Sequence, residues 1–430
     1  MLRNQAHIFY YTNIPFCNVN VFNLMIKIFE IFKLVVCHLT ETVHQSFYLE
    51  QTIGFRFASN LKLYKMKTLI KIIVTTILTF ASIFANAQTT SEKELLKTLD
   101  ETTPVSLTNN NVPGMAIAII KDGKTIIEKG YGFADVKEGT KINSKTGFNI
   151  GSISKMFTAW GIMTLVEDGK LELDTPVSSY LKTWQVPSSE FDANKITIRN
   201  LLQHTAGLSV HGYNGYESKE VLTSTSASLS GKTNEQEAVQ LIMEPDTKWQ
   251  YSGGGYTILQ LVIEEVTGET FANFMDKNVF KPLKMKHTSF TIDNGVLKTS
   301  AKAYDENGKE IALRLFNAQA AAGLHTTLED LVLFANASFF ENSVLSQKSV
   351  SLLRTPTELS GGDYGMGYML MNRFGNFTLS GHGGSNEGWQ AGFMLDFDSK
   401  SGIIVLTNGS SGRNVLFGSM KTWAQWHSEN

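Results

Sequence analysis

Runs of apolar residues bounded by turn residues predict β-strands near both ends of this chain. Gly114 to Ile120 and Lys124 to Gly130 read as two strands joined at Asp122-Gly123, a dipeptide typical of tight hairpins. A second hairpin pattern follows at Gln390 to Phe397 and Gly402 to Thr407. We therefore expect strands from the two ends of the chain to pair within one sheet.

Helical periodicity dominates the rest of the chain. A capping box, Ser91-Glu92-Lys93-Glu94, opens a helix that is expected to run through about Leu99. Residues 211–234 are rich in Ser, Thr, Gly and Tyr, and they predict a long surface loop. Helical patterns are found at residues 155–168, 198–203, 235–243, 256–266, 328–339 and 414–426.

The order of these elements predicts an α/β layer domain combined with an all-α region. The sheet is expected from about residues 112–150 and 375–430. A helical region of about residues 151–374 is then inserted between its two halves.

Residues 66–87, MKTLIKIIVTTILTFASIFANA, have the layout of a secretory signal peptide. Two lysines precede a 13-residue apolar stretch, and a small-x-small cleavage signal ends at Ala87. The stretch is short for a membrane span, which takes about 20 residues. We expect translation to begin at Met66 and residues 1–65 to be a non-native upstream extension. Cleavage after Ala87 predicts a periplasmic or secreted protein, with no stable membrane anchor.

Composition narrows the chemistry that is open to the mature chain. All 430 residues carry 38 basic and 40 acidic side chains, a net charge of −2, so nucleic acid is not an expected partner. Both cysteines, Cys17 and Cys37, precede Ala87, which removes disulfides, thiolate nucleophiles and Cys-ligated metals from the mature chain. Four histidines lack metal-ligand spacing and are interpreted as structural: His204, His211, His287 and His325.

Ser152-Ile153-Ser154-Lys155 is the first candidate for catalysis. A Ser and a Lys three residues apart at a helix start share one face, and the helix N-terminus favours negative charge on the Ser oxygen. A partly desolvated Lys can be neutral enough to accept the proton. The pattern alone is weak, since it recurs at Ser59…Lys62 and Ser179…Lys182. Gly151 before the serine and an apolar helix after Lys155 favour the first copy.

Two glycine-rich segments add further candidates. Tyr251 opens the turn Tyr-Ser-Gly-Gly-Gly before a helix, and His382-Gly383-Gly384-Ser385 lies on or beside a late strand. Glycines in such places allow another group or a substrate backbone to come close. Taken singly, Tyr251 fits a packed aromatic in a turn better than a functional residue. His382 taken singly fits an ordinary loop histidine as well as a functional one. Trp389 and Tyr213 are possible cleft residues that the sequence alone does not decide.

Together these motifs resemble the serine β-lactamase and penicillin-binding protein superfamily. The similarity is greatest to class C β-lactamases, DD-carboxypeptidases, D-aminopeptidases and family VIII esterases. It covers about residues 100–427, with supporting segments FNIGSISKMFTA at 148–159, ITIRNLLQHTAGL at 196–208 and GHGGSNEG at 381–388. The resemblance implies a β-lactamase/transpeptidase-like fold over residues 88–430, in which helices flank an antiparallel sheet.

The resemblance also implies a covalent acyl-enzyme mechanism. Ser152 would be the nucleophile, and Lys155 and Tyr251 would share the acid and base work. Backbone N–H groups of Ser152 and Ser385 would form the oxyanion hole. His382, where the family often has the Lys of K-T-G, would position and polarise a substrate carboxylate or the tyrosine. Substrate binding would fall to Gly253, Gly383, Gly384 and Asn386, with no metal and no cofactor.

Gly253 departs from the family pattern, which has Asn as the third residue of Tyr-x-Asn. That Asn holds the acyl-side amide of the substrate, so its loss favours a small, loosely held ester or amide over a β-lactam or a peptide. The leading hypothesis is an exported serine hydrolase of the DD-peptidase/D-aminopeptidase, β-lactamase or esterase type, with cell-wall fragments among its possible substrates. The alternative is a catalytically weak or inactive sensor or binding protein; the intact Ser152, Lys155 and Tyr251 argue against it.

Overall fold

The computed structural model describes residues 68, 71, 75, 90–217, 222–232, 237–371 and 377–430. The chain divides into two units, Met1–Asn86 and Ala87–Asn430, and nearly all described residues belong to the second. The predicted upstream extension, the signal peptide apart from three of its residues, and the Ser59…Lys62 motif lie outside the described residues, so they stay predictions. No helix of the described part has the length and apolar character that a membrane crossing requires.

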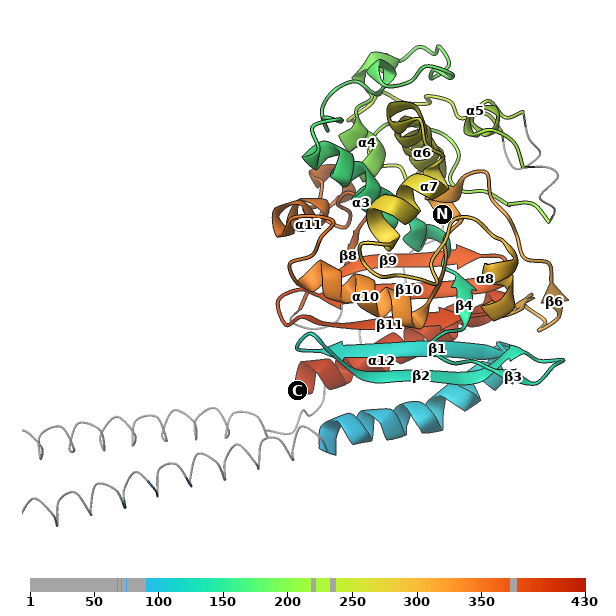
Figure 1. The fold of residues 1–430 in the computed structure, drawn as a ribbon, viewed down its shortest axis with the longest axis vertical. Helices are drawn as coiled ribbons and strands as arrows, with labels where there is room; N and C mark the ends of the chain where they lie inside the picture. The colour runs from blue at the N-terminus through green and yellow to red at the C-terminus, as the bar shows by residue number, and fades with distance from the viewer. Residues whose placement is uncertain are drawn as a thin grey trace, which may run out of the picture. The chain divides into compact units, whose positions relative to one another are not determined.

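A seven-stranded antiparallel sheet joins the two ends of the second unit (Figure 1). Its strand order, β3-β2-β1-β11-β10-β9-β8, places N-terminal β1 directly against C-terminal β11. Both predicted hairpins and the predicted pairing of the chain ends are confirmed. The strands are β1 (Gly114–Lys121), β2 (Lys124–Asp135), β3 (Thr140–Lys141), β8 (Met369–Met371), β9 (Leu379–Asn386), β10 (Trp389–Asp396) and β11 (Ser401–Thr407).

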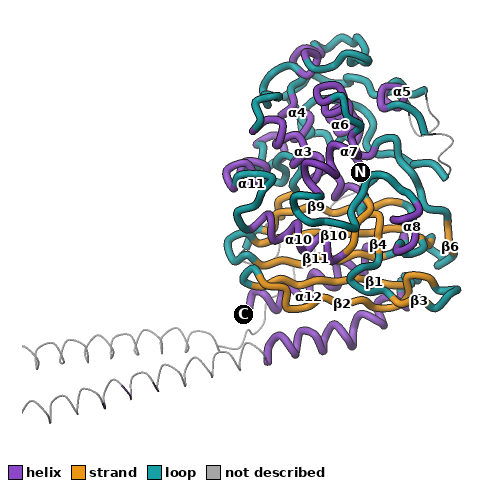
Figure 2. Tube along the Cα trace, viewed as in Figure 1, coloured by secondary structure: helices purple, strands orange, loops and turns teal. Residues whose placement is uncertain are grey.

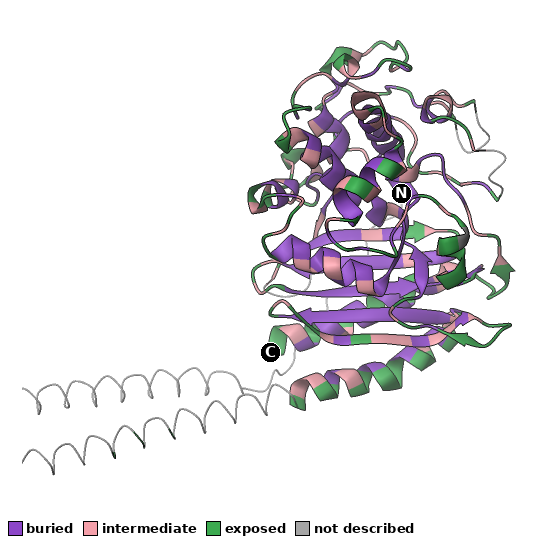
Figure 3. Cartoon of the chain, in the orientation of Figure 1, coloured by how far each residue is buried: buried purple, intermediate pink, exposed green. Residues whose placement is uncertain are grey.

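Every residue of β1 is buried because both faces of the sheet are covered (Figure 3). Successive side chains of a strand point to opposite faces, and those of β1 accordingly enter two different cores. Ile117 packs with side chains of the helix at residues 90–109 and of α12 (Arg413–Glu429). Its neighbour Ala118 belongs to the larger core, which includes α10 (Leu328–Phe339) and the helical region.

Figure 2 shows much of the helical region gathered beyond strand β9. Its helices are α3 (Ser154–Glu167), α4 (Ile198–Gln203), α5 (Thr225–Leu229), α6 (Gly253–Thr267), α7 (Phe271–Met275), α8 (Asn294–Thr299), α9 (Gln319–Ala322) and α11 (Gln347–Leu353). Two short strand pairs accompany them: β4 (Gly147–Asn149) with β7 (His325–Thr327), and β5 (Ala303–Tyr304) with β6 (Glu310–Ile311). The antiparallel sheet with flanking helices and an inserted helical region therefore matches the expected fold class.

Two predicted elements are wrong in part. The helix expected at 235–243 is extended over its described residues, 237–243. Buried Val239 and Leu241 flank exposed Gln240, a period of two that belongs to a strand-like segment, and Leu241 bridges to Leu208.

The expected surface loop at 211–234 is more ordered than its composition indicated. Within its described residues it contains helix α5, whose Leu229 is fully buried. Tyr216 also forms a bridge to Leu315. The predicted first helix, by contrast, is real but longer, and runs on through residue 109.

The packing of α12 yields a stability prediction. Trp423 is completely buried against the sheet, whereas Phe417 of the same helix is 41% exposed. Trp423→Ala should lower the free energy of unfolding by about 3 to 5 kcal/mol, because it leaves a cavity, and Phe417→Ala should change it by no more than about 0.5 kcal/mol. Urea unfolding followed by circular dichroism measures both. A loss below about 1 kcal/mol for Trp423→Ala would contradict the packing described.

Candidate active site

Ser152 lies in a tight turn that leads into helix α3. The turn is a 3₁₀ segment, Gly151–Ile153, and Gly151 has a positive φ of 51° that favours glycine. The Asn149 side chain accepts a hydrogen bond of 3.0 Å from the Gly151 N–H, and the Ile150 N–H donates to the Leu324 carbonyl at 3.0 Å. The turn therefore holds a partly exposed Ser152 at the start of a buried helix.

Lys155 lies one helical turn beyond Ser152 and is almost completely buried, with 2% of its surface exposed. Its Nζ is 3.2 Å from Ser152 Oγ and donates to the Ala321 carbonyl of α9 at 2.7 Å. Burial lowers the pKa of Lys155 to about 7. A lysine with such a pKa is largely unprotonated just above neutral pH, and it is then a base within reach of the serine hydroxyl.

Tyr251 completes the group around Ser152. Its hydroxyl shares a hydrogen bond with the Ser152 side chain, and its ring lies 4.9 Å from Lys155 Nζ. Burial raises the pKa of Tyr251 well above its usual value, so the phenol stays protonated near neutral pH. Neighbouring Ser252 caps helix α6 and donates to the Ser209 carbonyl at 2.7 Å, which fixes the segment that carries the tyrosine.

Strand β9 presses directly on the serine turn. A Cβ at Gly384 would lie 1.9 Å from the Ile150 carbonyl oxygen, and a Cβ at Gly151 would lie 2.7 Å from the Ser385 backbone nitrogen. Only glycine fits at both positions, because no side chain can occupy that space. The backbone segments of Ser152 and Ser385, assigned to the oxyanion hole from sequence, thus lie side by side.

His382 lies beside this group, with its ring centroid 6.2 Å from that of Tyr251, but both of its ring nitrogens have other partners. It is 2% exposed, with Nε2 3.1 Å from the Tyr364 hydroxyl and Nδ1 2.5 Å from the Gly383 carbonyl. Burial, with a smaller effect from nearby Lys155, lowers its pKa to about 3, so the imidazole is neutral. His382 is therefore neither charged nor accessible, and the structure does not support its predicted contact with a substrate carboxylate.

Asn386 and Gly253, both predicted to bind substrate, have structural partners. Asn386 Nδ2 donates to Asn149 Oδ1 at 2.6 Å and to the Ala322 carbonyl at 3.0 Å, and it thereby ties β9 to the serine turn. A Cβ at Gly253 would lie 3.1 Å from Cε2 of Tyr213. The Tyr213 ring therefore borders the position where the family's Asn side chain would begin.

Sequence reasoning missed several residues around the site. His204 and Tyr364 lie next to Tyr251, with ring centroids 4.2 Å and 6.4 Å from it. His204 was interpreted as structural, and no local motif distinguished Tyr364. Trp389, a possible cleft residue, is instead 1% exposed in the core, while the Trp249 ring lies 6.3 Å from Tyr251 and is 36% exposed.

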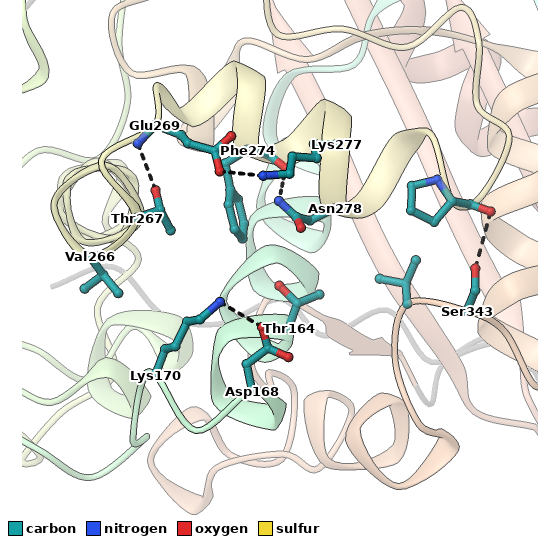
Figure 4. Close-up of a pocket in the computed structure, with 12 residues that line it drawn as sticks. Thr164, Asp168, Lys170, Val266, Thr267, Glu269, Phe274, Lys277, Asn278 and Ser343 are labelled. Atoms are coloured by element: carbon teal, nitrogen blue, oxygen red, sulfur yellow. Dashed lines mark hydrogen bonds and ion pairs between the residues drawn. The ribbon is translucent and has the colours of Figure 1, made fainter.

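A cavity of about 410 Å³ lies elsewhere, at the far end of α3 (Figure 4). Thr164 and Asp168, which help to line it, follow Ser152 by more than three helical turns. Its charged side chains pair with each other, as in the 3.0 Å ion pair between Lys170 and Asp168. This cavity therefore does not share residues with the serine group.

The second S-x-x-K motif does not form such a group. Ser179 is exposed, and Lys182 Nζ donates to the Glu265 carbonyl at 2.9 Å. Of the motif copies that fall within the described residues, the one at Ser152 alone combines a buried lysine with a tyrosine.

Comparison with known proteins connects this geometry to a family. The sequence profile of the family described as Beta-lactamase matches residues 92–418. Protein flp of Staphylococcus aureus (strain MW2) is 29% identical over 71% of this chain, which spans 61% of that relative's length. The putative penicillin-binding protein PbpX of Bacillus subtilis (strain 168) is 29% identical over 73% of this chain and 75% of its own length.

Solved structures agree on the fold. The octameric penicillin-binding protein homologue from Pyrococcus abyssi superposes with a TM-score of 0.64 at 27% identity, over 74% of each chain. A D-stereospecific amidohydrolase from Streptomyces sp. superposes with a TM-score of 0.60 over 72% of this chain and 94% of its own. At 20% identity, that second likeness concerns the fold alone.

The lowered pKa of Lys155 predicts how the reactivity of Ser152 depends on pH. Below about pH 7 the protonated amine cannot accept the serine proton, so labelling by an uncharged fluorophosphonate should slow about tenfold per pH unit and level off above pH 7. Lys155→Met should reduce the plateau rate by about 100-fold or more, whereas exposed Lys182→Met should not change it. A profile that is flat from about pH 5 to about pH 9 would exclude Lys155 as the base.

Proposed function

Because the chain belongs to the Beta-lactamase family, within the serine β-lactamase and penicillin-binding protein superfamily, we propose that it is an exported serine hydrolase. In this proposal it cleaves uncharged esters or small amides through an acyl-enzyme on Ser152. The observation that carries the proposal is the 3.2 Å approach of a buried Lys155, with a pKa of about 7, to the hydroxyl of Ser152.

The three side chains divide the proton transfers between them. Neutral Lys155 takes the Ser152 proton as Oγ bonds to the substrate carbonyl carbon, and the backbone N–H groups of Ser152 and Ser385 stabilise the oxyanion. Tyr251, protonated because of its raised pKa, passes a proton to the leaving alcohol or amine and regains one from Lys155. Water then attacks the acyl-enzyme, and its proton returns to Ser152 by the same route.

An uncharged substrate is favoured because the site offers little to bind a carboxylate. The His382 imidazole is neutral and buried. Arg314, which lies beside the strand end that follows Ser385, is paired with Glu217 at 2.9 Å and with Glu387 at 2.8 Å. Gly253 also lacks the amide that would hold the acyl-side amide of a peptide or β-lactam.

The close approach of Tyr213 to Gly253 also favours a second candidate function. Here the Tyr213 ring borders the place where the family has a polar Asn side chain. This arrangement is compatible with a protein that is acylated on Ser152 but hydrolyses its acyl-enzyme slowly. Such a protein would be a binding or sensor protein on the same scaffold. It differs from a hydrolase in its deacylation rate, which single-turnover kinetics measure.

A substrate panel tests the proposed hydrolase. Short-chain p-nitrophenyl esters should be turned over faster than nitrocefin or D-Ala-D-Ala peptides, because His382 is neutral and Arg314 is already paired with two carboxylates. Ser152→Ala should lower kcat/KM for the ester on the order of 1000-fold or more, as expected for a lost nucleophile. Ser179→Ala, the matched change in the exposed S-x-x-K motif, should leave it unchanged.

Ester hydrolysis that survives Ser152→Ala would mean that the nucleophile is wrong. Stable labelling of Ser152 without turnover on any member of the panel would favour the binding protein over the hydrolase.

A further inference from the structure

A buried chain of hydrogen bonds runs from the backbone of Ser252 to the backbone of Gly383. It passes through His204, Tyr364 and His382, each of which is 2% exposed. The Ser252 N–H lies 3.1 Å from His204 Nδ1, and His204 Nε2 lies 3.2 Å from the Tyr364 hydroxyl. The Tyr364 hydroxyl lies 3.1 Å from His382 Nε2, and His382 Nδ1 lies 2.5 Å from the Gly383 carbonyl.

The two backbone ends fix the direction of every hydrogen bond in this chain. The Ser252 N–H can only donate, so Nδ1 of His204 accepts and its proton sits on Nε2. That proton is donated to the Tyr364 oxygen, whose own proton is then donated to Nε2 of His382. The proton of His382 is therefore on Nδ1, where it meets the Gly383 carbonyl, which can only accept. In a protonated His204, the Nδ1–H would face the Ser252 N–H, and neither group could accept a hydrogen bond. The geometry therefore requires a neutral imidazole at His204.

This chain connects the elements that carry the reactive groups. Ser252 directly follows Tyr251, and Gly383 lies two residues before Ser385 on β9. The segment that carries Tyr364 is also anchored on helix α3. Gly367, at a φ of 82°, lies so close to it that a Cβ would be 3.1 Å from the Lys155 carbonyl oxygen.

We propose that Tyr364 is a positioning residue, which holds Tyr251 and the oxyanion strand β9 in register through the two histidines. It does not touch the reacting atoms, and its role rests on the proposed function of Ser152. Removal of the hydroxyl alone, in Tyr364→Phe, keeps the ring among its aromatic neighbours but breaks the chain at its centre. Misplacement of catalytic groups by about 1 Å can cost on the order of 100-fold in rate, so we expect a 10- to 100-fold loss.

The kinetic test compares Tyr364→Phe with a matched control in the same segment. The Tyr368 hydroxyl is as deeply buried and accepts a hydrogen bond of 2.9 Å from Trp160 Nε1, but it contacts neither histidine of the chain. With a fluorophosphonate, Tyr364→Phe should lower the maximal rate of Ser152 labelling about 10- to 100-fold and leave the half-saturating concentration unchanged. Tyr368→Phe should keep the wild-type rate, and thermal unfolding establishes that both variants are folded.

A spectroscopic test examines the hydrogen-bond chain directly and does not depend on an activity measurement. Long-range ¹H–¹⁵N correlation on protein with ¹⁵N-labelled histidine should show His204 as the Nε2–H tautomer and His382 as the Nδ1–H tautomer. Tyr364→Phe should keep both tautomers, because the Ser252 N–H and the Gly383 carbonyl remain in place. It should shift the Nε2 signals of both histidines, because each loses its hydrogen bond to the hydroxyl, and Tyr368→Phe should leave them unchanged.

Three outcomes would overturn the proposal, and they separate it from the proposed function. An Nε2–H tautomer of His382 in the wild type would contradict the hydrogen-bond chain. Wild-type labelling rates in Tyr364→Phe would contradict the positioning role while leaving the hydrolase intact. A wild type that is not labelled at Ser152, with both tautomers as expected, would contradict the hydrolase and the positioning role together.

Discussion

Burial of the Lys155 side chain is the constraint on which the site depends. Moving the pKa from 10.5 to about 7 corresponds to roughly 5 kcal/mol of free energy that disfavours the charged amine. Apolar burial of helix α3 offsets this free energy, because most residues of the helix are buried. The carbonyl of Ala321 then gives the amine a hydrogen-bond partner, so that it is buried without being unsatisfied. Desolvation makes it unfavourable to bury Lys155 in its charged form. The same desolvation keeps the amine neutral, so that it can act as a base.

Close backbone approach is the second requirement, and small residues meet it. Gly151 and Gly384 allow the serine turn and strand β9 to touch at distances that exclude a Cβ. Ala320 and Ala321, both essentially unexposed, let α9 come near enough to α3 for its carbonyls to reach Thr158 and Lys155. Reactive groups from three regions of the chain thus converge, and α9 adds the carbonyl partners from a fourth.

Local sequence patterns predicted most of the fold and the centre of the site. The dipeptide Asp122-Gly123 indicates a hairpin from local sequence alone. The apolar run after Lys155 likewise indicates a buried helix, whichever elements pack against it. The motif at Ser152 is similarly local. Sequence failed where a residue's role depends on distant contacts: Tyr364 meets His204, 160 positions earlier, and nothing near either residue signals it. Only the folded chain shows that Trp389 turns into the core rather than a cleft.

A direct titration of Lys155 tests the central claim. In protein with lysine labelled by ¹³C at Cε, the shift of each lysine follows its protonation, and the signal that disappears in Lys155→Met identifies this residue. We expect the Lys155 signal to titrate near pH 7, well below the ordinary lysine pKa of about 10.4. If the Lys155 signal titrated near that ordinary value instead, the amine would be charged at neutral pH, and the proposed activation of Ser152 would be contradicted.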